Sequence, residues 1–279
     1  MTNRRNTFRL GSIVLIVSYL VIPSTFAAAD ELIYSTQEQV FSDTQNAPCR
    51  DEDRLAAVSA LFKRFGASDT DIAVVEKPRN LVVTLKGAGP GYLVVGAHYD
   101  KVNAGCGAID NWTGVVLLTH VYKALRQSRP NRTILFVAFG GEETGLKGSK
   151  AMVAAIAKQD RASYCAMVNL DSFGLARPQV LENATTRKLL NFVRVVAEKC
   201  KVPIASASLE GVADADSSSF KSAGIPAVTL HGLSNDWFRI IHTQRDNVES
   251  IKSASVYLGY ILCMNLVGQL DGCECNAFR

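Results

Sequence analysis

The sequence predicts an α/β fold, a three-layer α/β/α sandwich around a mixed, mainly parallel sheet. Three short apolar runs predict its buried strands, at residues 92–97, 133–139 and 164–170. They are rich in β-branched residues, as strands covered on both faces must be. Longer segments with helical periodicity lie between them, at 115–125 and 146–157. Strands that alternate with helices predict parallel pairing, with helices on both faces of the sheet.

Length and charge set the frame for this fold. The chain has 279 residues, 48% of them hydrophobic, which is ample for one large domain. No Gly/Ser-rich or Pro-rich linker interrupts residues 49–279, so we predict a single domain there. The formal net charge is only +4, and the basic residues are scattered, which argues against nucleic-acid binding. The apolar stretch 257–270 is too short to span a bilayer and predicts a packed terminal helix.

The amino terminus has the pattern of an export signal over residues 1–29. Three arginines precede the apolar stretch 12–22, and the small residues Ala27, Ala28 and Ala29 follow it. A membrane anchor is the alternative, but the apolar stretch is short for a span, so cleavage near Ala29 is favoured. We expect a secreted or periplasmic protein with no stable membrane insertion after cleavage. Residues 30–48 are predicted to form an exposed leader to the domain.

Seven cysteines follow the predicted signal, and an exported chain meets an oxidising compartment in which disulfides form. Because seven is an odd number, at least one thiol remains unpaired within the chain. Cys273 and Cys275 are too close in sequence to pair comfortably with each other. Cys49 and Cys200 are candidate partners for them, and the sequence leaves the connectivity open. No C-x-x-C pair occurs, which argues against a cysteine metal cluster.

Acidic and histidine residues follow each of the three predicted strands. His98 and Asp100 follow the first, Glu142 and Glu143 the second, and Asp171 the third. In such sheets ligands bind beyond the carboxyl ends of the strands, so these side chains are expected in one cleft. Residues two apart at a strand end project to the same side, which lets Asp100 orient the imidazole of His98. Taken alone, a histidine at a strand end is more often an ordinary polar residue.

Glycines shape the loops that carry the other carboxylates. A Gly-rich loop at 107–114 brings Asp110 back over the strand ends, although Asp110 alternatively caps the helix that follows. Gly140 and Gly141 let the chain bend, so that Glu142 and Glu143 can converge on one site. One of these suits a metal ligand and the other a base that takes a proton from water. An acidic pair at a helix amino terminus is the alternative interpretation.

Six motifs, in this order and spacing, together resemble the M28 zinc peptidases: H-Y-D, G-A-I-D-N-W-T-G, F-V-A-F-G-G-E-E-T-G-L-K-G-S, N-L-D-S-F-G, S-A-G-I-P-A-V and I-H-T-Q-R-D-N. They cover about residues 80–251, most of the predicted domain. The resemblance implies a phosphorylase/hydrolase-like fold with two zinc ions. It implies His98 and Asp171 as ligands of one ion, Glu143 and His242 as ligands of the other, and Asp110 as the bridge.

The resemblance also implies the remaining chemistry. Glu142 would be the general base, and Asp100 would orient His98. The peptide bond after the bridging aspartate is often cis in this family, so a cis bond is expected at Asp110-Asn111. Together these features imply a secreted metal-dependent exopeptidase that acts on peptides, in the first place an aminopeptidase with a two-zinc-activated water.

Two other functions remain open. A glutaminyl cyclase-like acyltransferase with one zinc also has adjacent glutamates and an H-T-x-x-D-N segment like residues 242–247. An inactive peptide-binding module on the same fold is the third possibility. The compact G-G-E-E-T-G-L-K-G-S loop and the retained His98 look more like the peptidase branch.

The chain departs from the family near residue 216. The family often reads S-D-H-x-P-F where this chain reads A-D-S-S-S-F at 215–220. Asp216 aligns and is expected to line the substrate cleft, where it would hold a free amino terminus, or to cap a helix. His231 is a partial substitute for the missing imidazole, although a hydrogen bond within its loop is favoured. Three aromatic residues are candidates for apolar walls or for packing: Trp112, Trp237 and Phe238.

Overall fold

Eight strands form one mixed sheet in the order β1-β2-β4-β3-β5-β8-β6-β7. The computed structural model describes residues 34–75 and 79–279, so the signal predicted at 1–29 lies outside the described residues. The strands are β1 (Ile72–Val75), β2 (Asn80–Leu85), β3 (Tyr92–His98), β4 (Thr133–Phe139), β5 (Tyr164–Leu170), β6 (Gln179–Leu181), β7 (Ala205–Ala207) and β8 (Ala227–His231). The α-helices are α1 (Gln37–Thr44), α2 (Asp51–Arg64), α3 (Thr113–Leu125), α4 (Lys147–Ala155), α5 (Arg187–Lys199), α6 (Ser217–Ser222) and α7 (Ser253–Asp271).

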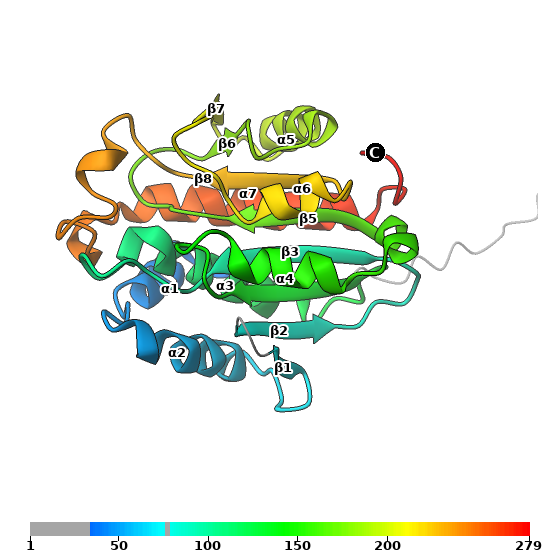
Figure 1. Cartoon of the computed structure of the whole chain (residues 1–279), viewed down its shortest axis with the longest axis horizontal. Coiled ribbons are helices and arrows are strands. Elements are labelled where there is room, and N and C mark those ends of the chain that lie inside the picture. Colours follow the sequence, from blue (N-terminus) through cyan, green and yellow to red (C-terminus); the bar gives the residue numbers. More distant parts are fainter. Residues whose placement is uncertain (1–33, 76–78) are drawn as a thin grey trace, which may run out of the picture. The chain divides into compact units, whose positions relative to one another are not determined.

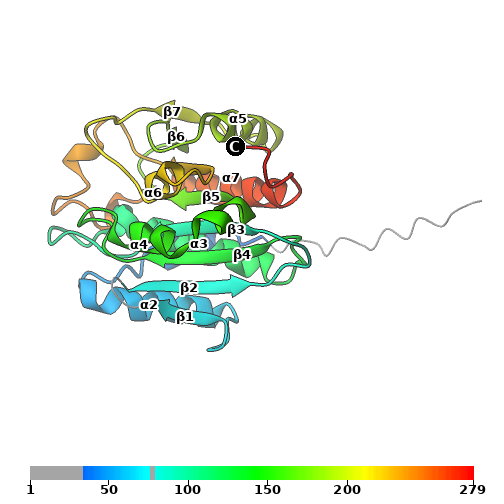
Figure 2. The ribbon, with the colours of Figure 1, turned by 45° about the vertical axis from the view of Figure 1, so that its right-hand side comes forward.

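The centre of the sheet is parallel and its flanks are antiparallel. β4, β3, β5 and β8 run in one direction, as the predicted alternation of strands and helices requires. β2 pairs antiparallel with β4, and β6 pairs antiparallel with β8. Figures 1 and 2 show β1 and β7 at the two opposite edges. The carboxyl ends of the four central strands therefore meet at one edge of the sheet.

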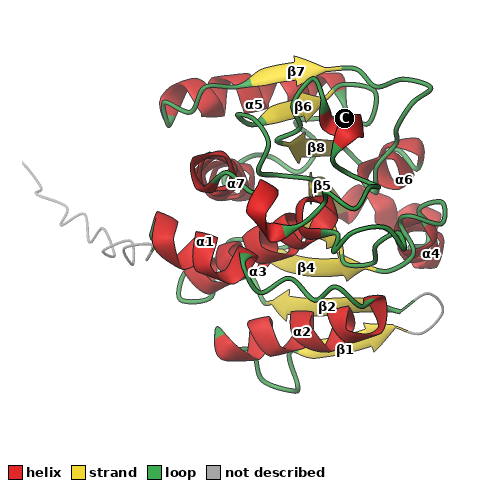
Figure 3. Ribbon diagram, turned by 90° about the vertical axis from the view of Figure 1, so that its left-hand side faces the viewer, coloured by secondary structure: helices red, strands yellow, loops and turns green. Residues whose placement is uncertain are grey.

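Side chains of the central strands alternate between two cores, one on each face of the sheet. In β3, Leu93 and Val95 join the larger core, which α1, α2, α3, α5 and α7 cover. Val94 between them joins the smaller core, with Val153 of α4 and Phe220 of α6. Figure 3 shows α4 and α6 on one side of the sheet and α1 and α7 on the other. The predicted three-layer α/β/α sandwich is confirmed.

The predicted exposed leader is wrong where the structure describes it. Thr36 caps α1, and Val40 on that helix is fully buried against the larger core. Ser35 is also fully buried: its N–H donates to the hydroxyl of Tyr260 at 3.0 Å, and its Oγ lies 2.7 Å from Nδ1 of His120. The polar composition of this segment suggested solvent exposure, but these polar groups are satisfied inside the protein.

His120 and Asp43 form a buried acid-sensitive pair, 2.9 Å apart, that fastens α1 to α3. Burial lowers the pKa of His120, and the hydrogen bond to Asp43 only partly offsets this. Burial alone would raise the pKa of Asp43, but hydrogen bonds from His120 and Arg64 outweigh it and lower that pKa. The folded pair is thus a neutral imidazole beside an ionised carboxylate.

Both shifts favour folding at higher pH. Below pH about 6.5, His120 becomes protonated in the unfolded chain but stays neutral in the folded protein, so the free energy of unfolding falls. The stabilising contribution of Asp43 is lost at still lower pH. We expect the free energy of unfolding of His120→Gln, which keeps an N–H donor, to fall less than that of the parent between pH 7.5 and 5.5. Urea unfolding at both pH values measures this. An equal decline in the two proteins would contradict it.

α7 packs as a core helix. Within residues 34–75 and 79–279 it alone has the length and composition of a membrane-spanning helix. Its residues Val256, Tyr260, Cys263 and Leu266 are nevertheless fully buried, and the helix contacts α1, α3 and α5. The packed terminal helix predicted at 257–270 is confirmed.

Two disulfides join distant segments. Cys49 pairs with Cys106, which ties the start of α2 to the loop after β3. Cys165 of β5 pairs with Cys275 in the carboxyl-terminal segment. The partners suggested for Cys275 were therefore wrong, because chain folding, not sequence spacing, brings its partner close. Three thiols are free: Cys200, Cys263 and Cys273.

Candidate metal centre

Strand ends bring the predicted site residues together. His98 is the last residue of β3, and Asp171 directly follows β5, its neighbour in the sheet. Glu142 and Glu143 follow β4 on the other side of β3, in the turn that leads to α4. Gly141 adopts a left-handed φ of +76° in this turn, which glycine reaches without steric cost. All four side chains line one cavity.

A buried loop presents Asp110 to the same edge. The short segment η1 (Ala108–Trp112) carries it. Its backbone is not helical at Asp110 and Asn111, and the bond Asp110-Asn111 is cis, as expected. The Asp246 carboxylate accepts the N–H of Ile109 at 2.6 Å and that of Asp110 at 3.3 Å. Asn111 donates to the carbonyl of Leu170 at 2.9 Å, which fastens the loop to the end of β5. Asp110 is thus held from both sides.

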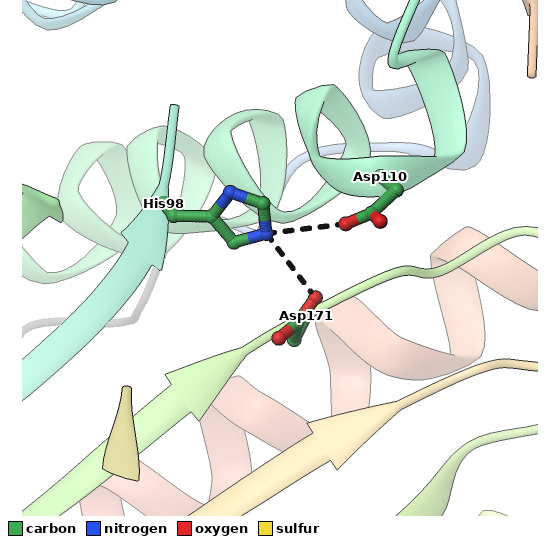
Figure 4. A group of neighbouring side chains, drawn as sticks. All are labelled: His98, Asp110 and Asp171. Atoms are coloured by element: carbon green, nitrogen blue, oxygen red, sulfur yellow. Dashed lines mark hydrogen bonds and ion pairs between the residues drawn. The ribbon is translucent and has the colours of Figure 1, made fainter. Parts of the chain in front are cut away.

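The first group of possible ligands comprises His98, Asp110 and Asp171 (Figure 4). Nε2 of His98 lies 3.1 Å from Oδ1 of Asp110 and 3.5 Å from Oδ1 of Asp171. The hydroxyl of Ser172 donates to the same two carboxylate oxygens, at 3.1 and 3.0 Å. All three ligand residues are buried.

The second group comprises Asp110, Glu143 and His242. Nε2 of His242 lies 3.0 Å from Oδ2 of Asp110 and 3.1 Å from Oε2 of Glu143. Asp110 therefore offers one oxygen to each group. His242 is exposed and has a left-handed φ of +60°, a conformation that non-glycine residues adopt mainly where the surroundings enforce it.

Asp100 supports both sides of the centre. Its carboxylate accepts the backbone N–H of Glu142 at 3.0 Å and that of Glu143 at 3.2 Å. Nδ1 of His98 lies 3.2 Å from the backbone carbonyl oxygen of Asp100, within hydrogen-bond distance, and 3.6 Å from its carboxylate Oδ1. The carbonyl acceptor at Nδ1, with the carboxylate close by, favours the tautomer that leaves Nε2 free for a metal. Asp100 thus fixes the Glu142–Glu143 turn as well as His98.

The centre carries more negative than positive charge. Burial alone would lower the pKa of His98, but the carboxylates around it, above all Glu142, hold that pKa well above its usual value. Hydrogen bonds to Asp110 and Glu143 raise the pKa of His242 to about 10. Burial raises the pKa of Glu143, and its buried Oε1 has no hydrogen-bond partner. A cation would supply the missing positive charge and a partner for this oxygen.

Glu142 lies beside both groups but belongs to neither. Burial raises its pKa to about 9; His98 opposes the rise, while Asp171, Asp216 and Asp110 add to it. A carboxyl that is poised next to possible metal ligands, with an elevated proton affinity, is suited to proton transfer.

The cavity at this centre has a volume of about 350 Å³. Trp237 lines it, whereas Trp112 is buried in the core and Phe238 is 57% exposed outside the lining. Asp216 also differs from expectation: it is fully buried, does not line the cavity, and its two carboxylate oxygens have no hydrogen-bond partner. The preceding loop instead places Asp214 on the cavity wall. Direct contact between Asp216 and a substrate is therefore not supported.

Three supporting residues were missed in the sequence. Ser172 and Asp246 lie inside recognised motifs, N-L-D-S-F-G and I-H-T-Q-R-D-N, but had been given no role. Arg54 lies far upstream on α2 and is fully buried. Its guanidinium donates to the carbonyls of Tyr99, Pro48, Cys106 and Gly107, around the loop that leads to η1. No local pattern around Arg54 marks this role, because its partners are backbone atoms.

Known proteins resemble this chain in sequence and in fold. The model of peptidase family M28 matches residues 80–259. Leucine aminopeptidase 1 of Fusarium vanettenii is 28% identical over 225 residues, which cover 70% of this chain and 57% of that protein. A zinc aminopeptidase from Bacillus subtilis superposes with a TM-score of 0.63 and 23% identity, covering 72% of this chain and 52% of that one.

A second enzyme class shares the fold. A glutaminyl cyclase from an Acidobacteriales bacterium superposes with a TM-score of 0.66 and 19% identity, over 85% of this chain and 92% of that one. At such identities the structural likeness concerns the fold alone. The chain spans less than two thirds of the leucine aminopeptidase it matches.

Proposed function

Because the chain belongs to peptidase family M28, we propose that it is a zinc-dependent aminopeptidase, which hydrolyses the amino-terminal peptide bond of peptides. The observation that carries this proposal is the position of Asp110. Its two carboxylate oxygens face two different histidines, His98 at 3.1 Å and His242 at 3.0 Å. One carboxylate between two ligand groups is the arrangement that a two-metal hydrolytic site requires.

The ligand chemistry fits zinc. Each group combines one imidazole with two carboxylates. Calcium prefers ligand sets made of oxygen alone, whereas zinc accepts nitrogen and oxygen together and leaves a position open in catalytic sites. Zinc in this centre would supply Lewis acidity that activates water and polarises the scissile carbonyl. Two ions are proposed because the ligand atoms form two groups.

The chain's own residues perform the proton transfers in this mechanism. Burial, together with the neighbouring carboxylates, raises the pKa of Glu142 to about 9, but cations in the centre would lower it and favour the ionised carboxylate. Glu142 would then accept a proton from the attacking water and return it to the departing amine. Asp100 keeps Glu142 in place through the backbone N–H that it accepts at 3.0 Å. The excess of carboxylates along the cavity attracts the ammonium group of a free amino terminus. This attraction favours an aminopeptidase over an enzyme that acts at a carboxyl terminus.

Secretion or periplasmic export is part of the proposal. The basic, apolar and small-residue pattern over 1–29 supports it. The disulfides Cys49–Cys106 and Cys165–Cys275 support it as well, since such bonds persist in oxidising compartments.

The decisive experiment combines metal content with product analysis of the zinc-loaded protein. We expect two zinc ions per chain and release of free amino acids from unblocked peptides, with no release from acetylated ones. Chelation should remove the activity and zinc should restore it. One zinc with formation of pyroglutamyl peptides would instead identify a cyclase. A protein that binds no metal and turns over no peptide would be a binding module on this fold.

A further inference from the structure

Part of the lining of the cavity beside the metal centre is apolar. Leu181, Leu209, Val212, Leu233, Trp237 and Ile241 line it. Such a wall suits the side chain of the amino-terminal residue of a peptide whose scissile bond lies at the metal centre. His231 is among the polar residues that also line this cavity.

His231 presents an N–H donor that the protein does not use. Its side chain is only 4% exposed, and its Nδ1 accepts the backbone N–H of Leu233 at 3.3 Å. A neutral imidazole that accepts at Nδ1 carries its proton on Nε2. Nε2 has no hydrogen-bond partner in the described structure. A buried donor without an acceptor is costly, so this atom points to a ligand that supplies one.

The other polar groups on this part of the wall are already occupied. Thr229 Oγ1 lies 2.6 Å from Ser217 Oγ and accepts from Asn169 at 3.3 Å. Ser172 donates to the metal-centre carboxylates. Among cavity-lining residues in the described ranges, Glu143 Oε1 and His231 Nε2 are the buried side-chain atoms that lack a partner. Glu143 is accounted for as a proposed metal ligand, which leaves His231.

The turn that holds His231 is fixed by hydrogen bonds to neighbouring segments. Gln179 pairs with His231 across β6 and β8, and its side chain donates to the carbonyl of Leu233. The N–H of Gly232 donates to the carbonyl of Ser172 at 2.9 Å. A Cβ at Gly232 would lie 3.1 Å from a backbone carbonyl oxygen, so the turn is tightly packed against the neighbouring loop. The donor is therefore preorganised.

We propose that His231 selects substrates whose amino-terminal side chain is an uncharged amide, glutamine or asparagine, by donating its Nε2–H to the amide oxygen. This inference rests on the proposed aminopeptidase function and names the residue class that the same site prefers. The apolar wall packs against the methylene groups of the side chain. An aliphatic side chain of the same size leaves the donor unpaired, and the site then discriminates against it.

Charge decides between an amide and a carboxylate. The cavity lining already contains Asp110, Glu142, Glu143, Asp171 and Asp214. A glutamate or aspartate side chain would add a further negative charge beside them, which is unfavourable in a partly buried site. A neutral amide offers the same acceptor without that repulsion.

The test uses the zinc-loaded full-length enzyme and two pairs of nearly isosteric substrates. Aminoacyl p-nitroanilides of glutamine and methionine form one pair, and those of asparagine and leucine form the other. For each pair kcat/KM is measured with the parent, with His231→Phe and with His231→Gln, which retains an N–H donor. Each ratio within a pair is taken from a single preparation, so a partly inactive variant still gives a valid ratio.

We expect the parent to favour the amide in each pair. His231→Phe should lower the amide-to-aliphatic ratio about tenfold, chiefly through the amide substrates, and His231→Gln should recover part of it. Zinc content should not change. A parent that prefers methionine and leucine, or ratios that His231→Phe leaves unaltered, would overturn the inference while the peptidase function stands. The proposed function itself would be refuted if the zinc-loaded parent released p-nitroaniline from none of the four substrates and released no amino acid from unblocked peptides.

Discussion

Glu142→Gln is expected to lower kcat by about 10²- to 10⁴-fold, the usual contribution of a general base, while zinc content stays at the parent level. The physical reason is that Glu142 lines the cavity but lies outside both groups of possible ligands. Glutamine has nearly the same shape and cannot accept the proton. Steady-state kinetics and metal analysis on the same preparation test both halves of the expectation.

A matched control separates this effect from a general loss of negative charge. Glu198→Gln removes an exposed carboxylate on α5, and it should leave both kcat and zinc content unchanged. Full activity in Glu142→Gln would exclude Glu142 as the base. A parallel loss of zinc would show instead that Glu142 belongs to the ligand set.

His242→Ala should show the opposite pattern. We expect the affinity for zinc in the second group to fall by about 100-fold or more, since even residues that only orient metal ligands contribute 10- to 100-fold. His242 is the imidazole of the second group, and its Nε2 lies 3.0 Å from Asp110 and 3.1 Å from Glu143. Turnover should fall with metal content and recover in part at high zinc concentration. Equilibrium dialysis against zinc buffers measures the affinity.

Arg245→Ala is the control for this prediction, because Arg245 is exposed in the same loop. It should bind zinc as the parent does. Parent-like zinc affinity in His242→Ala would exclude His242 as a ligand. Failure of excess zinc to restore any turnover would give the residue a role other than metal binding.

The fold was predictable from local patterns where burial dictates composition. The runs at 133–139 and 164–170 coincide with β4 and β5, because strands covered on both faces must be apolar throughout. The leader was mispredicted because the polar residues Ser35 and Asp43 are buried. Their partners, Tyr260 and His120, are far away in the sequence. The polar composition of a segment indicates solvent exposure on average, but it cannot show that particular polar residues form buried hydrogen bonds with residues far away in the sequence.

The same distinction, between features set by local pattern and features set by distant contacts, holds for the candidate site. Residues at strand ends, such as His98, Glu143 and Asp171, could be predicted to lie together because the topology of a parallel sheet places them at one edge. The outcome at Asp216 differed because alignment with a motif gives a position along the chain and not the direction of a side chain. The role of Arg54 could not be predicted because it donates to backbone carbonyl oxygens, which every residue has, so no sequence motif marks these partners. The residues that position the candidate ligands were thus harder to predict than the candidate ligands themselves.

The single carboxylate between the two ligand groups has a thermodynamic consequence. The backbone N–H groups of Ile109 and Asp110 are held by Asp246. The two oxygens of Asp110 belong to one planar carboxylate, so neither can move independently of the other. A cation in one group would reorient this carboxylate and shift the free energy of binding in the other by the same amount in either order. The two affinities are then properties of the pair, and a zinc titration of the protein should follow a coupled isotherm instead of two independent ones.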